Sequence, residues 1–256
     1  MTDHSPANEA LAQLVSQVRT AAEEHSALTI EGGGSKHFLG RLTQAPTLST
    51  RGLSGIVSYE PTELVLTALA GTPLSEVEAS LREKDQMLVF EPPHFGANAT
   101  VGGAIASGLS GPRRPFAGAV RDFVLGTRVL NGKGEVLAFG GQVMKNVAGY
   151  DISRLMTGAL GSLGVIVEVS LKVLPLPGAT QTLGFDMSAS DAVAKVNEWA
   201  GSPIPLSAAC HDGERLRVRI EGTPRAVAAV AARLGGDCEE EHARGEAGVF
   251  WTALRE

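Results

Sequence analysis

Two glycine-dense turns, far apart in the sequence, carry the residue types with the clearest chemical potential. Gly32-Gly33-Gly34-Ser35-Lys36 ends a short apolar run, and Ala99-Thr100-Val101-Gly102-Gly103-Ala104 follows dozens of residues later. Glycine has no Cβ and tolerates positive φ, so the backbone of such turns can come very close to a ligand. Consecutive N–H groups in a turn can also form a nest that binds an anion. We therefore predict that both turns hold one phosphate-bearing cofactor, which requires them to converge in the fold.

The composition is that of an ordinary globular protein and excludes several classes of function. The chain has 256 residues, of which 43% are hydrophobic and 20% charged, and its net charge is −6. A nucleic-acid-binding surface would need a basic patch, so we expect no nucleic-acid partner. The six histidines are scattered without a metal-binding spacing, and Cys210 and Cys238 are the only cysteines. They can form neither a disulfide framework nor a four-thiolate cluster site, so we predict no metal site.

The N-terminal sequence and the hydropathy favour a cytoplasmic protein. Residues 1–6 lack the basic and apolar regions of a signal peptide. No apolar stretch approaches the roughly 18 residues that a membrane-spanning helix needs. We therefore expect no transmembrane segment.

Hydrophobic periodicity predicts the elements that must position the two turns. Amphipathic or capped segments predict helices at 8–25, 72–84 and 151–157, the second opened by Thr72-Pro73. Apolar or alternating runs predict strands at 28–30, 56–59, 64–69, 88–90, 124–130, 135–139 and 165–173. Asn131-Gly132 between two β-rich runs indicates a hairpin. The strict alternation over 165–173 indicates a strand with one buried face.

The last third of the chain has a different pattern. It begins with a strand at 183–185 and a helix over 190–200 capped by Ser190 or Asp191. A hairpin of 206–210 and 216–220 comes next, and then an alanine-rich helix over 224–234. This βαββα order is typical of a ferredoxin-like unit. We place the boundary in the proline-rich segment 174–178, which gives a domain over 1–178, with lobes at about 26–92 and 93–178, and a second domain over 179–256.

Common nucleotide-binding and hydrolase motifs are absent. Neither turn contains G-x-G-x-x-G, so a Rossmann site is unsupported. The segment 126–133 lacks the spacing of a Walker A loop, and no G-x-S-x-G elbow occurs. A less common phosphate-binding design remains.

Four longer runs carry a resemblance to a known family. They cover 90–108, which contains Phe90-Glu91-Pro92-Pro93-His94-Phe95 and the second turn, then 120–126, 145–151 and 158–166. Together with the first turn they resemble the vanillyl-alcohol-oxidase and p-cresol-methylhydroxylase (PCMH) flavoprotein superfamily. Within it, they look most like the FAD-binding subunits of bacterial glycolate oxidases. The resemblance covers about residues 28–178.

The resemblance implies an α+β fold: a two-lobed PCMH-type FAD-binding domain followed by a short, truncated ferredoxin-like cap. It implies that residues of three segments contact FAD: Gly32, Gly33, Gly34, Ser35 and Lys36; Thr100, Gly102, Gly103 and Ser107; and Gly161, Gly164, Val165 and Ile166. Relatives that bind flavin covalently through the first turn carry histidine where this chain has Ser35, so we expect non-covalent FAD.

Lys145 and Tyr150 are the best candidates for catalytic groups near the flavin. A cation there could stabilise a reduced, anionic ring. The alternative is a helix-capping lysine and a core tyrosine. The metal-binding His-rich motif of relatives that oxidise 2-hydroxy acids directly does not occur in this chain.

The resemblance implies an FAD-dependent oxidoreductase subunit that takes part in electron transfer within a glycolate (2-hydroxy-acid) oxidase complex. Its expected partners are a catalytic FAD subunit and an iron–sulfur subunit, through which it could attach to the inner face of the membrane. One alternative is a self-sufficient FAD-dependent hydroxy-acid dehydrogenase. Another is a cofactor-free assembly subunit, favoured by Glu31, because relatives more often carry a basic residue just before the glycines.

Other charged residues and both cysteines are interpreted as structural. Arg121-Asp122 is predicted to be an ion pair, Arg113-Arg114 a solvated pair, and Arg217 and Arg219 the polar face of a strand. Cys210 and Cys238 are predicted to be buried small hydrophobic residues.

Overall fold

The computed structural model describes residues 6–41, 43–141, 150–244 and 248–256. The chain divides into two compact units, and each unit is drawn from several stretches of sequence. Unit 1 comprises Met1–Lys84, Pro92–Leu109 and Val120–Val173; unit 2 comprises Asp85–Glu91, Ser110–Ala119 and Leu174–Glu256. Unit 2 therefore takes two short segments from sequence that otherwise builds unit 1. Of the helices in the described part of the chain, none combines the length and apolar character that crossing a bilayer requires.

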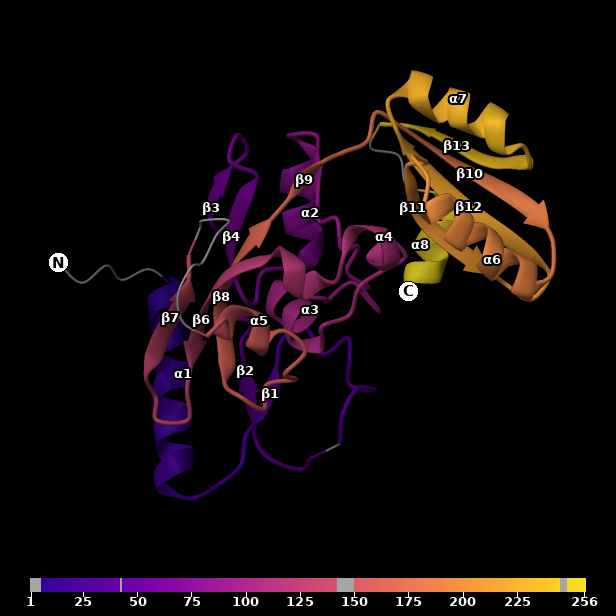
Figure 1. Ribbon diagram of the computed structural model, residues 1–256. Helices are drawn as coiled ribbons and strands as arrows, with labels where there is room; N and C mark the ends of the chain where they lie inside the picture. The colour runs from indigo at the N-terminus through magenta and orange to yellow at the C-terminus, as the bar shows by residue number, and fades with distance from the viewer. Residues whose placement is uncertain (1–5, 42, 142–149, 245–247) are drawn as a thin grey trace. The chain divides into compact units, whose positions relative to one another are not determined.

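Unit 1 is built on a five-stranded antiparallel sheet that includes strands from both predicted lobes (Figure 1). Its order is β3 (Ile56–Glu60), β4 (Val65–Leu69), β8 (Val165–Lys172), β6 (Val124–Leu130) and β7 (Val136–Gly140). A separate parallel pair, β1 (Thr29–Glu31) with β2 (Thr47–Ser49), carries the first glycine turn at its end. The predicted hairpin over Asn131-Gly132 is confirmed, since β6 pairs with β7 around it.

The central strand β8 is buried on both faces, so the prediction of a half-buried strand is wrong. Val165 and Val167 pack with Leu14 and Val18 of α1 (Pro6–Glu23). On the other face Ile166 is also buried, and the Ser170 hydroxyl lies 2.8 Å from that of Thr67 on β4. Glu168 likewise pairs with Arg128 on β6 at 3.2 Å, so two of the alternating polar residues of β8 have partners on neighbouring strands.

The remaining helices of unit 1 are short: α2 (Leu74–Arg82), α3 (Val101–Ser107), α5 (Ile152–Met156) and the 3₁₀ turn η1 (Val120–Phe123). The N-cap of α2 is Pro73, not Thr72. The Thr72 hydroxyl instead donates to the Leu69 carbonyl at 2.7 Å and accepts from the Gly55 backbone N–H at 2.9 Å. It joins the turn after β4 to the loop before β3.

The predicted strand at 88–90 is wrong. The strand is β5 (Gln86–Met87), which pairs with β9 (Leu174–Pro175) in unit 2. Leu88, Val89 and Phe90 form a turn instead, and all three are buried. Burial, rather than strand pairing, accounts for their apolar character.

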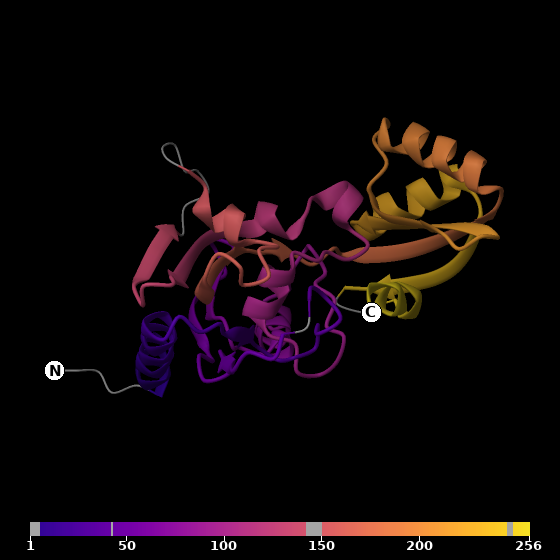
Figure 2. The ribbon, with the colours of Figure 1, turned by 90° about the horizontal axis from the view of Figure 1, so that it is seen from below.

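Unit 2 confirms and extends the ferredoxin-like prediction. Its antiparallel sheet has the order β11 (Leu206–His211), β12 (Arg215–Gly222), β10 (Ala179–Asp186), β13 (Asp237–Ala243). Helices α6 (Ala189–Ala200) and α7 (Pro224–Leu234) cover one face, and α8 (Val249–Arg255) lies against the other (Figure 2). The four-residue helix α4 (Arg114–Ala117) also belongs to this unit. The sequence did not predict β13 or α8, and the N-cap of α6 is Ser188 rather than Ser190 or Asp191.

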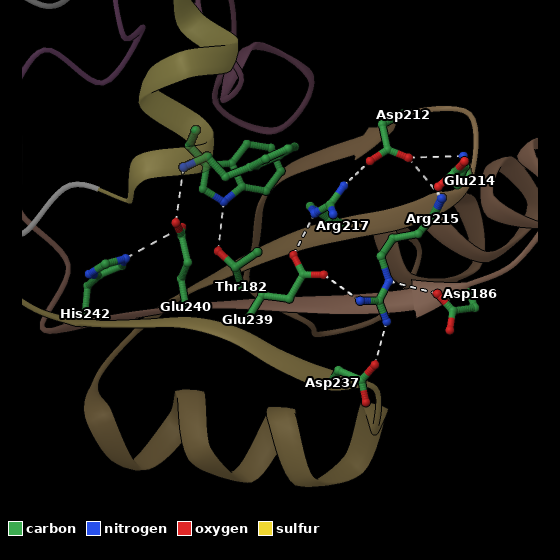
Figure 3. A network of polar contacts seen from close by, with 12 residues as sticks. Thr182, Asp186, Asp212, Glu214, Arg215, Arg217, Asp237, Glu239, Glu240 and His242 are labelled. Atoms are coloured by element: carbon green, nitrogen blue, oxygen red, sulfur yellow. Dashed lines mark hydrogen bonds and ion pairs between the residues drawn. The ribbon is translucent and has the colours of Figure 1, made fainter.

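The face of this sheet opposite α6 and α7 carries a polar network (Figure 3). Arg215 contacts the carboxylates of Asp186, Asp237 and Glu239 at 2.9, 2.5 and 2.8 Å. Arg217 lies 2.6 Å from Glu239 and also bonds to Asp212. Each guanidinium therefore has more than one acidic partner on neighbouring strands or turns.

Asp212 gives this network a pH dependence. It accepts hydrogen bonds from the backbone of Arg215 and Glu214, at 3.0 and 3.1 Å, and one from Arg217. These backbone bonds, followed by the Arg217 bond, hold the pKa of the Asp212 carboxyl well below its usual value.

We expect Asp212→Asn to lower the melting temperature of unit 2 slightly at pH 7. Because the folded-state pKa is depressed, the stabilising effect of the Asp212 carboxylate is present above the unfolded pKa of about 3.9 and disappears as pH falls further. Both tryptophans, Trp199 and Trp251, lie in unit 2, so their fluorescence reports its unfolding. The difference between wild type and variant should shrink only below about pH 4; a constant difference down to pH 2 would contradict this.

A cluster of two buried arginines and two half-buried glutamates joins the short segments of unit 2 to its sheet. We call Glu91, Arg113, Arg219 and Glu221 the ion quartet. Arg113 bonds to Glu91 at 3.2 Å and to Glu221, and Arg219 lies 2.8 Å from Glu91 and 3.4 Å from Glu221. The 2.8 Å contact is an ion pair rather than an aligned hydrogen bond. The prediction of a solvated Arg113 is therefore wrong, since this residue is buried. Arg219 lies on the polar face of its strand as predicted, but it is buried there among charged partners.

The structure also shows the surroundings of Asp122 and of the two cysteines. Asp122 lies 3.9 Å from Arg154, a pairing that the sequence did not predict. Cys238 is exposed and Cys210 is half-buried, so neither is a fully buried hydrophobic residue.

Candidate functional site

A cavity of about 640 Å³ in unit 1 is lined by the glycine turns and by the start of β8. Nearly all the predicted FAD-contacting residues line it: Gly32, Gly33, Gly34, Ser35, Lys36, Thr100, Gly102, Gly103, Ser107, Gly161, Gly164 and Ile166. Val165 does not line the cavity, because it points from β8 into the core formed with α1. The three predicted segments thus meet in one place.

The two glycine turns are in direct contact. A Cβ on Gly33 would lie 1.5 Å from the carbonyl oxygen of Asn98, and one on Gly32 would lie 2.5 Å from the Thr100 hydroxyl. No side chain fits at Gly33 without moving the backbone of the second turn. The convergence that a shared anion requires is therefore present.

The first turn is held by residues that follow β2, which the sequence did not single out. The Glu31 carbonyl accepts a hydrogen bond from the Thr50 backbone at 2.8 Å. Arg51 donates from Nε to the Gly32 carbonyl at 2.9 Å and from Nη2 to the Gly33 carbonyl at 3.0 Å.

The amides of the first turn differ from its carbonyls in their hydrogen bonding. Within the described part of the chain, the backbone N–H groups of Gly33, Gly34 and Ser35 have no hydrogen-bond acceptor. Gly34 has a φ of +72°, a conformation that glycine adopts without strain. Three consecutive donors beside a cavity have the chemistry of an anion-binding nest.

The second turn contributes packing rather than free donors. Its amides already have acceptors: Val101 donates to the Thr72 carbonyl, Gly102 to that of Ala70, and Gly103 to the Thr100 hydroxyl. A Cβ on Gly102 would lie 2.7 Å from the Cβ of Ala70. Gly102 is therefore required for the close approach of α3 to the turn after β4, and this segment forms a wall of the cavity.

The third segment also depends on backbone conformation. Gly161 and Gly164 have φ values of +77° and +142°. A Cβ on Gly164 would lie 3.0 Å from the Leu130 carbonyl of β6. These glycines let the chain turn tightly into β8 beside the cavity.

Charged side chains at the first turn have partners close by. The Lys36 ammonium donates to the Ser35 hydroxyl and to the His94 carbonyl, each at 3.3 Å, and lies 5.6 Å from the ring centre of Phe95. The Glu31 carboxylate lies 3.3 Å from the His37 imidazole. An acidic residue before the glycines therefore has a basic group beside it.

Of the two predicted catalytic residues only Tyr150 has a described position, and it does not line this cavity. Lys145 lies outside the described residues. The Tyr150 side chain is 93% exposed, so it is not a core tyrosine, and it is not among the cavity-lining residues. The described walls otherwise combine threonine hydroxyls and glycine amides with apolar side chains such as Ile30, Met156 and Leu160. Such a surface fits a ligand that has both a diphosphate and flat apolar rings.

Comparison with known proteins agrees with this chemistry. A family model described as "FAD binding domain" matches residues 7–140. The chain is 51% identical over 243 residues to the glycolate oxidase subunit GlcE of Escherichia coli, covering 95% of this chain and 67% of that protein. It is 33% identical over 151 residues to a D-2-hydroxyglutarate dehydrogenase of Xanthomonas citri, covering 58% of this chain and 31% of that enzyme.

A solved structure shares the fold at low sequence identity. Alkyldihydroxyacetonephosphate synthase superposes with a TM-score of 0.73 at 16% identity, over 95% of this chain and 52% of that one. The chain thus spans about two thirds of its bacterial glycolate oxidase relative and about half of this structure.

Proposed function

The chain belongs to the family of FAD-binding domains, and from this premise we propose that it is the FAD-binding subunit of a glycolate or related 2-hydroxy-acid oxidase. In this proposal residues 1–178 form the FAD-binding domain and 179–256 form a short cap domain. The FAD is bound without a covalent link.

One observation carries the proposal: two glycine turns of distant sequence meet at Gly33 and Asn98, beside one cavity where backbone donors have no acceptor among the described residues. The family match and the 51% identity to a glycolate oxidase subunit support the cofactor and the substrate class.

The chain's own groups would serve mainly to bind and orient the cofactor. We propose that the amides of Gly33, Gly34 and Ser35 hold the diphosphate and that the Lys36 ammonium adds positive charge nearby. The apolar walls at Ile166 and Leu160 would shield the rings from water. When bound, FAD supplies the electron- and hydride-transfer chemistry.

We expect the purified chain to be yellow and to release its flavin on acid precipitation. Ser35 replaces the histidine that forms the covalent link in some relatives of the superfamily. An absorption spectrum of the intact protein and of the acid supernatant tests both statements. Flavin that stays in the precipitate would contradict the non-covalent bond. A chain that stays colourless after incubation with FAD would contradict the function.

We also propose that a catalytic FAD subunit and an iron–sulfur subunit are the partners, in a complex at the inner face of the membrane. Within these 256 residues Cys210 and Cys238 are too few to ligate a cluster, so the proposal assigns the cluster to the iron–sulfur partner. Glycolate-dependent reduction of a dye should require co-expressed partner subunits and should be lost without this chain. Glycolate oxidation by the purified chain alone would instead indicate a self-sufficient dehydrogenase.

A further inference from the structure

Arg51 makes an unusual set of contacts for an exposed arginine. Its guanidinium donates from Nε and Nη2 to two consecutive carbonyls, those of Gly32 and Gly33, at 2.9 and 3.0 Å. Both donors lie on one edge of the planar guanidinium, which matches two acceptors held side by side. Exposed arginines usually gain little from a fixed geometry, because ordering the side chain costs conformational entropy.

The peptide geometry gives this contact a consequence on the other side of the turn. In a trans peptide unit the C=O and the following N–H point in opposite directions, and the described chain has no cis peptide bond. Fixing the Gly32 carbonyl therefore fixes the N–H of Gly33, and fixing the Gly33 carbonyl fixes the N–H of Gly34. These two amides are among those at the cavity that have no acceptor within the part of the chain that the structure describes.

A third carbonyl is held in the same way. The Glu31 carbonyl accepts from both the backbone and the hydroxyl of Thr50, at 2.8 and 3.3 Å. Residues 50 and 51 thus bind three consecutive carbonyls, one at the end of β1 and the first two of the turn. Hydrogen bonding of a cation to a carbonyl also polarises the peptide group, which makes its N–H a stronger donor.

We infer that Arg51 is a positioning residue for the diphosphate nest: it holds the Gly32 and Gly33 peptides so that their amides face the cofactor, without touching the cofactor itself. The inference rests on the proposed function, since it assumes that FAD occupies this cavity. Arg51 is absent from the residues that line it. Its effect should therefore depend on its two-point geometry and not on its charge alone.

The test compares FAD binding by the full-length wild-type chain and by two variants. Arg51→Met keeps the alkyl stem and removes every donor; Arg51→Lys keeps the charge but loses the planar fork. We expect Arg51→Met to raise the Kd for FAD by about tenfold or more, and Arg51→Lys to restore only part of the loss. Arg82→Met, an exposed change on α2 away from the cavity, is the matched control and should bind like wild type.

Two further readouts separate positioning from a general effect on folding. The unfolding transition of the apo chain, followed by circular dichroism, should be nearly unchanged in both Arg51 variants. The ³¹P resonances of bound FAD, measured at saturation, should shift in Arg51→Lys because the amides that face the diphosphate have turned.

Wild-type affinity in Arg51→Met, full rescue by Arg51→Lys, or unchanged ³¹P resonances would overturn the positioning role. A variant that loses FAD only because its apo form unfolds would also overturn it. A wild-type chain that takes up no FAD would instead overturn the proposed function, on which the inference depends.

Discussion

Gly33→Ala is expected to weaken FAD binding by about a hundredfold. The new methyl group would lie 1.5 Å from the Asn98 carbonyl oxygen, which is a backbone atom and cannot rotate away. Either the first turn moves off the second, which separates the nest from its wall, or the backbone near Asn98 moves and the fold loses stability. Overpacking of this kind costs up to about 3 kcal/mol, which corresponds to roughly two orders of magnitude in Kd.

The measurement is a fluorescence titration of the apo chain with FAD, since free and bound flavin differ in emission. Gly132→Ala is the matched control: its Cβ would meet nothing within 4 Å, and its φ lies outside the left-handed region. The control should bind FAD like wild type. Unchanged affinity and stability in Gly33→Ala would show that the two turns do not need their close approach.

Glu221→Gln should destabilise unit 2 by about 3–5 kcal/mol. Glu221 faces both arginines of the ion quartet, so the neutral amide leaves two buried guanidinium groups with one carboxylate, that of Glu91. Burial already lowers the pKa of Arg219, and the negative charges of Glu91 and Glu221 oppose that shift. Without the Glu221 carboxylate, the free energy lost by burying the two guanidinium groups is no longer fully compensated by attraction to negative charge.

Denaturant unfolding followed by the fluorescence of Trp199 and Trp251 measures the effect in unit 2. Glu198→Gln, which breaks the exposed pair with Lys195, is the control and should cost less than about 1 kcal/mol. The double variant Arg219→Met with Glu221→Met removes one charge of each sign and should be more stable than Glu221→Gln. A loss below about 1 kcal/mol in Glu221→Gln would show that the quartet is not effectively buried.

Local sequence signals predicted the elements whose causes are local. The amphipathic pattern around Leu14 and Val18 gave α1, Asn131-Gly132 gave the hairpin, and Pro224 marked the start of α7. The strand β13 was missed because its sequence is mostly acidic and lacks apolar alternation. It is recognisable only once β10 is available as its partner.

Residues whose roles come from distant partners could not be predicted in this way. Arg219 alternates with apolar neighbours as a solvated arginine would, and its partner Glu91 lies in another part of the sequence. Arg51 follows an ordinary strand, and nothing near it indicates that it bonds to the glycine turn. By contrast, the turns themselves were recognisable, because glycine is required wherever backbones approach closely, as at Gly33 and Gly102.

The place of β8 in the sheet has a consequence for how the protein is synthesised and expressed. β8 lies between β4 and β6, yet it is the last strand of unit 1 to leave the ribosome. Until residue 172 has emerged, the nascent chain holds two strands whose inner edges lack a neighbour, and such edges promote aggregation. An expression fragment that stops at residue 140, where the family match ends, would keep those open edges permanently. A fragment intended to fold must therefore extend through β8.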